Sequence, residues 1–422
     1  MKSSYKKLGQ YIRQVDIRNL QDKRDNLLGV STKKIFIESI ANTVGTDFTK
    51  YKLVKKHQFT YVPDTSRRGD KIGIAMLEHL DEALVSQAYT VFEVTDHTKL
   101  LPEYLMMWFR REEFDRYARF KSHGSVREIF DWDEMCNVKL PIPSIDVQQN
   151  IVDQYNKINS RILLKIEAIT NIDRLGLAIY KEWFEDFDFP ISESLSLQLN
   201  NPKLIGKPYK SSNCEMIYSD VLGKEIPAHF EVFKLKDFCF DMRNGATPKR
   251  DILEYWTPPQ IKWIKTGEIF NNIIFDSEEK ISELGFQNSS TQILPNNTVL
   301  MAMYGATAAQ LAILKTEATT NQACCAMMCN SLDEASYLYF RLLNQQSEIK
   351  NLAIGGAQEN LNKDLIENLP ILFSKDIVNL IECFGKLIQY KSDLTHELLN
   401  LKEFSKKLLS RLAVKYCILR DS

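Results

Sequence analysis

Residues 145–184 have the sequence IDVQQNIVDQYNKINSRILLKIEAITNIDRLGLAIYKEWF. The stretch contains no proline and a single glycine, Gly176, so it predicts one continuous helix. At about 1.5 Å of rise per residue, this helix would be about 60 Å long. Its inward positions recur alternately every four and three residues, a period of about 3.5 that is typical of a coiled coil. These positions are Ile151, Tyr155, Ile158, Ile162, Lys165, Ile169, Ile172, Gly176, Ile179 and Trp183.

A seam of this kind needs a partner, and the C-terminal part of the chain offers one. Leucine recurs there every seven residues, at Leu380, Leu387, Leu394, Leu401 and Leu408. Ile377, Phe384, Leu398 and Leu412 complete the pattern. Two amphipathic helices packed into separate cores are the plainer alternative, but two matched seams favour an antiparallel intramolecular pair. Lys165 and Lys391 interrupt the seams, and they either fix the register or extend to solvent.

The composition is that of a folded protein with unevenly spread charge. A chain of 422 residues with 44% hydrophobic and 26% charged residues predicts two or three domains. The net charge is -1, but residues 1–71 hold 16 Lys or Arg against 7 Asp or Glu. A local basic face is what contact with phosphates requires, although many lysine-rich runs are only solvated surface.

Cysteine usage argues against a zinc site. The eight cysteines are scattered, and no Cys-x-x-Cys pair has a matching second pair. The start of the chain has no apolar signal core, so we expect a cytoplasmic protein with reduced thiols. The uncharged run 284–314 contains polar residues and a proline, so we expect strands and turns there and not a membrane span. The apolar run 322–328 predicts a buried strand.

The chain contains an internal repeat with a spacing near 230 residues. Residues 8–19 match 235–244, and Ser86-Gln87-Ala88 matches Asn321-Gln322-Ala323, both in strand-like runs. Glu103-Tyr104-Leu105 and Ser336-Tyr337-Leu338 each open a predicted helix, and glycine turns follow at 123–125 and 355–357. Leu140-Pro141-Ile142 and Leu369-Pro370-Ile371 precede the long helices. Residues 89–94 and 298–304 are rich in strand-forming types. Each copy therefore predicts a mixed α/β globule followed by a long helix.

This layout resembles the specificity subunit of type I restriction-modification systems over nearly the whole chain. The resemblance rests on Leu140-Pro141-Ile142-Pro143 through Gln148-Gln149, Ile226-Pro227, Met303-Tyr304-Gly305-Ala306-Thr307 and Thr320-Asn321-Gln322-Ala323, together with their order and the duplication. The first copy departs from the second at Val85-Ser86-Gln87-Ala88-Tyr89 and at Gly69-Asp70-Lys71. The two recognition surfaces are therefore not matched residue by residue.

The resemblance implies an α+β fold in which two similar mixed α/β target recognition domains are separated by two long helices forming an antiparallel coiled coil, a pseudo-two-fold repeat. The implied boundaries are 1–143 for the first domain, 144–186 for the central helix, 187–228 for a linker of polar composition, 229–374 for the second domain and 375–416 for the C-terminal helix. Each domain would recognise one half of a bipartite double-stranded DNA target. The implied partners are two methyltransferase subunits and two restriction/translocase subunits.

The resemblance also implies that the chain is not itself an enzyme. N6-adenine methylation and restriction would be carried out by the partners, which would hold S-adenosylmethionine, ATP and Mg, so no cofactor is expected here. The residues agree, because the only Pro-Pro lies in Thr257-Pro258-Pro259-Gln260 and no phosphate-binding Gly-x-x-x-x-Gly-Lys-Ser/Thr occurs. Glu278-Glu279-Lys280 lacks an upstream Asp that would suggest a nuclease, and the six histidines do not cluster.

Candidate DNA contacts are Lys, Arg, amide and hydroxyl residues, which bind phosphates and base edges. In the first copy they are Lys33, Lys34, Lys55, Lys56, Arg67, Arg68, His123, Ser125 and Arg127. In the second they are Arg243, Asn244, Thr247, Lys249, Arg250, Lys262, Lys265, Thr266, Tyr304, Thr307, Gln358 and Asn360. For each residue alone, ordinary surface is an equal alternative. For the whole chain, the alternatives are a related system with a fused methyltransferase-nuclease partner, a coiled-coil protein scaffold, or a stand-alone methyltransferase or nuclease.

Overall fold

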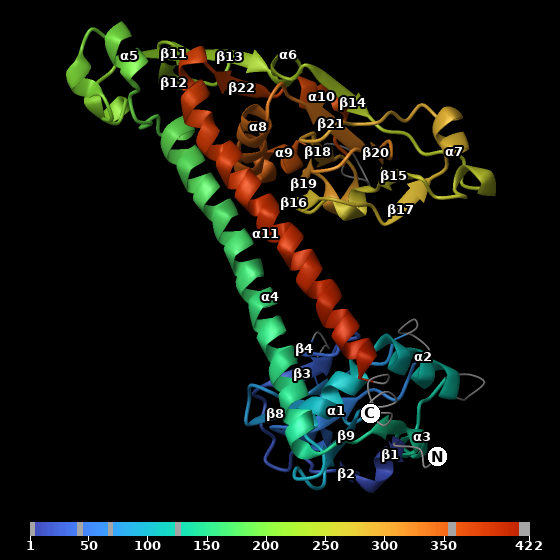
Figure 1. The fold of residues 1–422 in the computed structure, drawn as a ribbon. Helices are drawn as coiled ribbons and strands as arrows, with labels where there is room; N and C mark the ends of the chain where they lie inside the picture. The colour runs from blue at the N-terminus through green and yellow to red at the C-terminus, as the bar shows by residue number, and fades with distance from the viewer. Residues whose placement is uncertain (1–4, 40–44, 66–70, 123–127, 353–359, 413–422) are drawn as a thin grey trace. The chain divides into compact units, whose positions relative to one another are not determined.

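The computed structural model describes residues 5–39, 45–65, 71–122, 128–352 and 360–412. The chain forms two compact units. Unit 1 comprises Met1–Leu163 and Leu399–Ser422, and unit 2 comprises Leu164–Leu398. Figure 1 colours the elements in chain order.

Unit 1 is built on two four-stranded sheets. The first has the order β2 (Ile12–Val15), β9 (Thr90–Val94), β6 (Phe59–Tyr61) and β7 (Ile74–Met76), and the second has β4 (Phe36–Glu38), β3 (Leu27–Val30), β8 (Glu82–Val85) and β5 (Lys52–Lys55). β1 (Tyr5–Lys7) pairs with β10 (Lys139–Pro141), and the short helices are α1 (Pro102–Phe109), α2 (Glu112–Lys121) and α3 (Trp132–Asn137). Buried aromatic side chains such as Phe59, Phe92 and Phe109 fill the core between the first sheet and α1.

Unit 2 has a larger sheet and a smaller one. The larger has the order β14 (Asp241–Asn244), β21 (Cys324–Met328), β18 (Val299–Ala302), β19 (Leu311–Leu314) and β16 (Asn272–Ile274), and the smaller has β17 (Glu279–Ile281), β15 (Ile261–Ile264) and β20 (Thr319–Thr320). β13 (Glu231–Lys234) pairs with β22 (Pro370–Phe373), and β11 (Met216–Ser219) pairs with β12 (Lys224–Pro227). The short helices are α5 (Glu193–Gln198), α6 (Leu235–Phe238), α7 (Glu283–Gln287), α8 (Leu332–Asn344), α9 (Gln346–Asn351) and α10 (Lys363–Glu367).

The predicted duplication is confirmed by strand pairing. β2 pairs antiparallel with β9 as β14 does with β21, β3 pairs parallel with β8 as β15 does with β20, and β1 pairs with β10 as β13 does with β22. The pairing also corrects the predicted match of Leu140-Pro141-Ile142 with Leu369-Pro370-Ile371, because Lys7 faces Lys139 in one copy and Lys234 faces Pro370 in the other. A tyrosine hydrogen bond follows the corrected correspondence. The Tyr104 hydroxyl donates to the Pro141 carbonyl oxygen at 3.1 Å, and the Tyr337 hydroxyl donates to that of Leu372 at 2.6 Å.

Several local predictions need correction. Ser86-Gln87-Ala88 and Asn321-Gln322-Ala323 are not in strands but in the turns that precede β9 and β21. α8 begins at Leu332, because the Ser331 side chain caps it by accepting from the Glu334 amide, so Ser336-Tyr337-Leu338 lies inside that helix. The predicted glycine turns lie outside the described residues. Of the run 322–328, Cys324–Met328 forms the fully buried strand β21, as predicted, and the first two residues belong to the preceding turn.

The two long helices have the predicted seams. α4 spans Ile145–Tyr180 and continues into a π-helical turn at Lys181–Glu185, and α11 spans Val378–Arg411. Every predicted seam position on both helices is buried or half-buried. In unit 2 the end of α4 lies beside the start of α11 (Figure 1). Two ion pairs join the helices there, Lys165 with Glu397 and Asp173 with Lys391. Residue numbers increase along α4 where those of its partners on α11 decrease, so the two helices are antiparallel in this unit.

The seam glycine has a packing role. A Cβ at Gly176 would overlap the ring of Phe340 from α8. Phe340 in turn contacts Phe384 of α11, with ring centroids 5.3 Å apart. The helices therefore pack against each other and against α8, and only glycine leaves room for the Phe340 ring at this point of the seam.

Lys391 is buried and does not extend to solvent. Its side chain is 1% exposed, and its Nζ atom donates to both carboxylate oxygens of Asp173 at 2.7 and 2.9 Å. It also donates to the Tyr339 hydroxyl at 3.0 Å and to the Asn271 carbonyl oxygen at 3.1 Å. Burial lowers the pKa of Lys391 and raises that of Asp173, and each partner's charge opposes the shift. Lys165 forms its ion pair where it is 26% exposed.

Residues 187–228, predicted to be a linker from their composition, are folded. They carry α5, β11 and β12. Phe189 stacks on Tyr209 and on Phe230, with ring centroids 4.9 and 5.4 Å apart, and all three side chains are buried. A few aromatic residues thus form a small core that the average polarity of the segment conceals. Among the described residues, no helix is long and apolar enough to span a membrane.

We expect removal of the Asp173 carboxylate to destabilise unit 2 more than removal of the Lys391 ammonium. Asp173→Ala leaves a buried ammonium without its counter-ion, which lowers the free energy of unfolding by about 3 kcal/mol. Lys391→Met leaves a carboxylate that is 22% exposed and can be hydrated, so we expect a loss of about 1 kcal/mol. Urea unfolding followed by circular dichroism measures both losses.

Lys165→Met is the control, because its ion pair is more exposed and its loss costs about 0.5 kcal/mol. A larger loss for Lys391→Met than for Asp173→Ala would contradict this account of the buried pair.

Candidate nucleic-acid interface

Most of the predicted residues of unit 2 lie at the end of β14, on the loop after it and on the small sheet. Arg243, Asn244, Thr247, Lys249 and Arg250 are exposed. The loop is fixed where it leaves β14, because a Cβ at Gly245 would overlap the backbone of Thr320. The Thr247 hydroxyl lies 2.5 Å from Oε1 of Gln322. The loop therefore lies against the turn that carries Asn321-Gln322.

Acidic side chains accompany most cations on this surface. Arg243 pairs with Asp241 at 2.5 Å. The Lys262 ammonium donates to the Phe275 carbonyl oxygen at 2.9 Å and lies 3.9 Å from the carboxylate of Asp276. These cations are partly occupied by interactions within unit 2.

Glu279 joins two of the predicted residues. Its carboxylate accepts from Lys265 at 2.8 Å and from Arg250 at 2.5 Å. The hydrogen bond from Lys265 contributes most to lowering the pKa of Glu279, and the bond from Arg250 adds to it. The same hydrogen bond raises the pKa of Lys265. The Glu279 carboxylate and the Lys265 ammonium therefore remain charged around neutral pH.

The other predicted residues of unit 2 lie on neighbouring turns and loops. Tyr304 and Asn360 form an isolated β-bridge, and both are exposed. The Thr307 hydroxyl donates to the Tyr304 carbonyl oxygen at 3.2 Å. Thr266 is half-buried at the start of the short turn Thr266–Glu268 that follows Lys265. Gln358 lies outside the described residues.

In unit 1, three of the predicted lysines are exposed. Lys33 lies between β3 and β4, and Lys55 and Lys56 lie at the end of β5. The other predictions for this unit, apart from Lys34, lie outside the described residues: Arg67, Arg68, His123, Ser125 and Arg127.

The structure does not support the prediction that Lys34 contacts DNA, because Lys34 is a buried structural lysine. Its side chain is 5% exposed, and its Nζ atom donates to Asp115 at 2.6 Å and to the Phe109 carbonyl oxygen at 2.7 Å. Burial lowers its pKa, while the Asp115 carboxylate opposes that shift. Lys34 thus ties the loop between β3 and β4 to α1 and α2, and its ammonium is not available to a phosphate.

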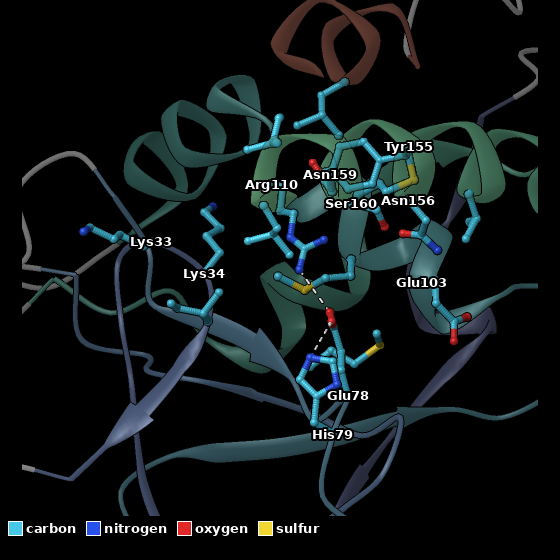
Figure 2. A pocket seen from close by; sticks show the side chains of 18 of the residues that line it. Lys33, Lys34, Glu78, His79, Glu103, Arg110, Tyr155, Asn156, Asn159 and Ser160 are labelled. Atoms are coloured by element: carbon cyan, nitrogen blue, oxygen red, sulfur yellow. Dashed lines mark hydrogen bonds and ion pairs between the residues drawn. The ribbon is translucent and has the colours of Figure 1, made fainter. Parts of the chain in front are cut away.

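Unit 1 also contains a cavity of about 920 Å³ that the sequence did not predict as a site. Figure 2 shows Arg110 and Glu78 pointing toward one another inside it, 3.0 Å apart, with His79 beside Glu78. α4 contributes Asn156 and Asn159. These asparagines flank the helix seam, which is the one sequence signal that could have indicated a polar lining. Positive and negative side chains occur together here, so the lining is not specific for an anion.

Metal chemistry finds no support in the part of the chain that the structure describes, where no group of three or more His, Cys, Asp or Glu side chains is placed to hold an ion. The described cysteines are free thiols, and burial raises the pKa of Cys325 to about 12. What the surface offers is cations, amides and hydroxyls on duplicated α/β units. Those are the groups that contact phosphates and base edges in proteins that bind nucleic acids.

Comparison with known proteins finds one matching domain and relatives of one kind. Residues 227–394 match the model of the type I restriction modification DNA specificity domain. The chain is 23% identical over 372 residues to the HindI specificity subunit of Haemophilus influenzae, covering 78% of this chain and 80% of that one. It is 23% identical over 206 residues to the MjaIX specificity subunit of Methanocaldococcus jannaschii, covering 49% of this chain but only 42% of the relative.

A solved structure supports the fold. The S subunit of a type I restriction-modification system from M. genitalium superimposes with a TM-score of 0.53 and 11% identity, covering 97% of this chain and 95% of that chain. The chain therefore carries the type I restriction modification DNA specificity domain over residues 227–394, and it is similar to a type I specificity subunit over most of its length.

We expect the adjacent residues Lys33 and Lys34 to differ sharply on substitution. Lys34→Met leaves the buried Asp115 carboxylate without its counter-ion and should lower the free energy of unfolding by about 3 kcal/mol. Lys33→Ala should change stability by less than about 0.5 kcal/mol. If Lys33 contacts a phosphate, its loss reduces the slope of log K against log salt for double-stranded DNA by about one. Unfolding and salt titrations measure both. A Lys34→Met variant of unchanged stability would overturn the structural role of Lys34.

Proposed function

We propose that the chain is the subunit that recognises a bipartite double-stranded DNA target, with each α/β domain recognising one half. The observation that carries the proposal is the duplication itself. Two copies of one module, each followed by a long helix of an antiparallel pair, are suited to two separated half-sites. The exposed cations, amides and hydroxyls of the loop after β14 supply the groups that bind phosphates and base edges.

The chain's role is recognition, and the chemistry belongs to partners. We infer that two methyltransferase subunits, which use S-adenosylmethionine to modify adenine at N6, and two ATP- and Mg-dependent restriction/translocase subunits assemble with it in the cytoplasm. The chain itself holds no cofactor in this proposal. A related system with a fused methyltransferase-nuclease partner would use the same recognition surface, and the identity of the co-purifying partner separates the two.

A protein-binding scaffold is the competing class. The seams of α4 and α11 favour it, since coiled coils commonly organise assemblies. Salt-dependent retention on DNA, measured together with the methyltransferase partner, distinguishes it from a recognition subunit. A scaffold retains the partner but gives the complex no preference for any DNA sequence.

We expect the purified chain alone neither to methylate nor to cleave DNA. A methyl-transfer assay with labelled S-adenosylmethionine and a plasmid-cleavage assay with ATP and Mg test this directly. Adding the methyltransferase subunit should restore methylation at specific sites. Turnover by the isolated chain would assign it to the enzyme class and remove the proposal.

The helix pair would act as a ruler between the two half-sites. If the seam residues Ile162 and Ile169 of α4 pack against α11, the lengths of the helices set the distance between the recognition surfaces. Those surfaces would then face successive exposures of one DNA groove, about 34 Å apart. The target becomes two short specified halves around a gap of unspecified bases.

Lengthening both helices equally tests the ruler. Insertions of four residues after Ile169 and after Leu394, positions set opposite by the Lys165–Glu397 and Asp173–Lys391 ion pairs, add about 6 Å to the pair. The gap should lengthen by nearly two base pairs while both half-sites keep their bases. Sequencing the methylated sites of a host that carries the variant gives the answer.

The control is a four-residue insertion after Val221, in the exposed turn between β11 and β12, which should leave the gap unchanged. An unchanged gap in the helix variant, or new bases in either half-site, would reject the ruler.

A further inference from the structure

The loop of residues 245–250 presents its side chains from a fixed backbone. The Ala246 amide donates to the Thr320 carbonyl oxygen at 2.9 Å, and the Ala246 carbonyl oxygen accepts from the Trp263 indole at 3.0 Å. Near the other end, the Trp256 indole donates to the Lys249 carbonyl oxygen at 3.0 Å. Because both ends are held, little conformational entropy remains to be lost when the loop meets a ligand.

Arg250 is the most constrained cation on this loop. Its guanidinium carbon lies 3.8 Å from the ring centroid of Trp256 and 4.7 Å from that of Trp263. Its Nη1 atom donates to Glu279 at 2.5 Å. The side chain nevertheless remains 50% exposed. Two indoles and one carboxylate thus fix the plane of a guanidinium that still faces solvent.

The neighbouring carboxylates decide what this guanidinium can bind. Glu279 is kept ionised by Lys265 and Arg250, and Glu278 lies 3.2 Å from the Lys265 ammonium. Because Glu279 already neutralises the Arg250 guanidinium, the pair has little net charge to attract a phosphate group, while the remaining N–H donors of the guanidinium can still bind a pair of neutral acceptor atoms. In the major groove, the neutral acceptor pair that fits an arginine fork is N7 and O6 of guanine.

We propose that Arg250 recognises a guanine in the half-site of the second domain and that Glu279 is its positioning residue. This inference rests on the proposed function and deepens it by assigning one base contact. The adjacent Lys249 is exposed and is not stacked, and its role is phosphate contact without sequence preference.

The test uses the chain assembled with its methyltransferase subunit. The target of the wild-type complex is determined first, by sequencing methylated sites, and affinity is then measured for the target and for every single-base substitution in it. Arg250→Lys keeps the charge but removes the fork and most of the stacking. We expect it to lose about 10- to 100-fold of the preference for one G·C pair in one half-site, with every other position unchanged.

Lys249→Ala is the matched control on the same loop. It should weaken binding to all sequences alike and lower the salt slope by about one. Glu279→Gln should reduce the preference at the same G·C pair as Arg250→Lys, by a smaller factor. Urea unfolding of each purified variant shows whether it stays folded.

The possible results distinguish a failure of the Arg250 assignment from a failure of the proposed function. A complex that selects its target normally with Arg250→Lys, or that loses preference at an A·T pair, overturns the assignment of Arg250 and leaves the proposed function standing. A wild-type complex with no sequence preference overturns the proposed function and this inference with it.

Discussion

The buried ammonium of Lys391 is the interaction on which the arrangement of unit 2 depends. It binds Asp173 on α4, Tyr339 on α8 and the carbonyl oxygen of Asn271 before β16, so one charge joins both long helices to the α/β domain. An apolar seam alone would tolerate a shift of one heptad with modest loss. A shift of one heptad would leave this ammonium buried without its acceptors, which is far more costly. The lysine therefore specifies the register that leucine periodicity leaves open.

The two copies share their strand pairing but differ in the side chains that pack at matched positions. Tyr104 and Tyr337 make the same hydrogen bond in the two copies, which aligns Met106 with Tyr339 and Met107 with Phe340. In unit 2 these aromatic side chains meet Lys391 and Phe384. In unit 1 the two methionines line the cavity of about 920 Å³. Methionine side chains are thinner and more flexible than the aromatic side chains at the matched positions, so they leave more room here.

The sequence predicted what repeats and missed what depends on distant contacts. Seams and duplicated strands leave periodic or paired signals, so the helices and the internal repeat could be predicted. Lys34 could not be identified as buried, because its partner Asp115 lies far along the chain and nothing local distinguishes Lys34 from exposed Lys33. Arg250 was only one candidate among many, since its indole and carboxylate neighbours follow no period. The small core of residues 187–228 was missed for the same reason.

In the proposed function, the pairing of cations with carboxylates bears on how a chain of net charge -1 would select DNA. Non-specific affinity grows with the number of phosphates neutralised, so Asp241 beside Arg243 and Glu279 beside Lys265 reduce it. A base contact from a pre-positioned guanidinium is weakened less, because its acceptors are neutral. The ratio of specific to non-specific binding therefore rises while total affinity falls. Such a surface requires further DNA contacts from elsewhere, which is a physical reason for a recognition subunit to act within a larger complex.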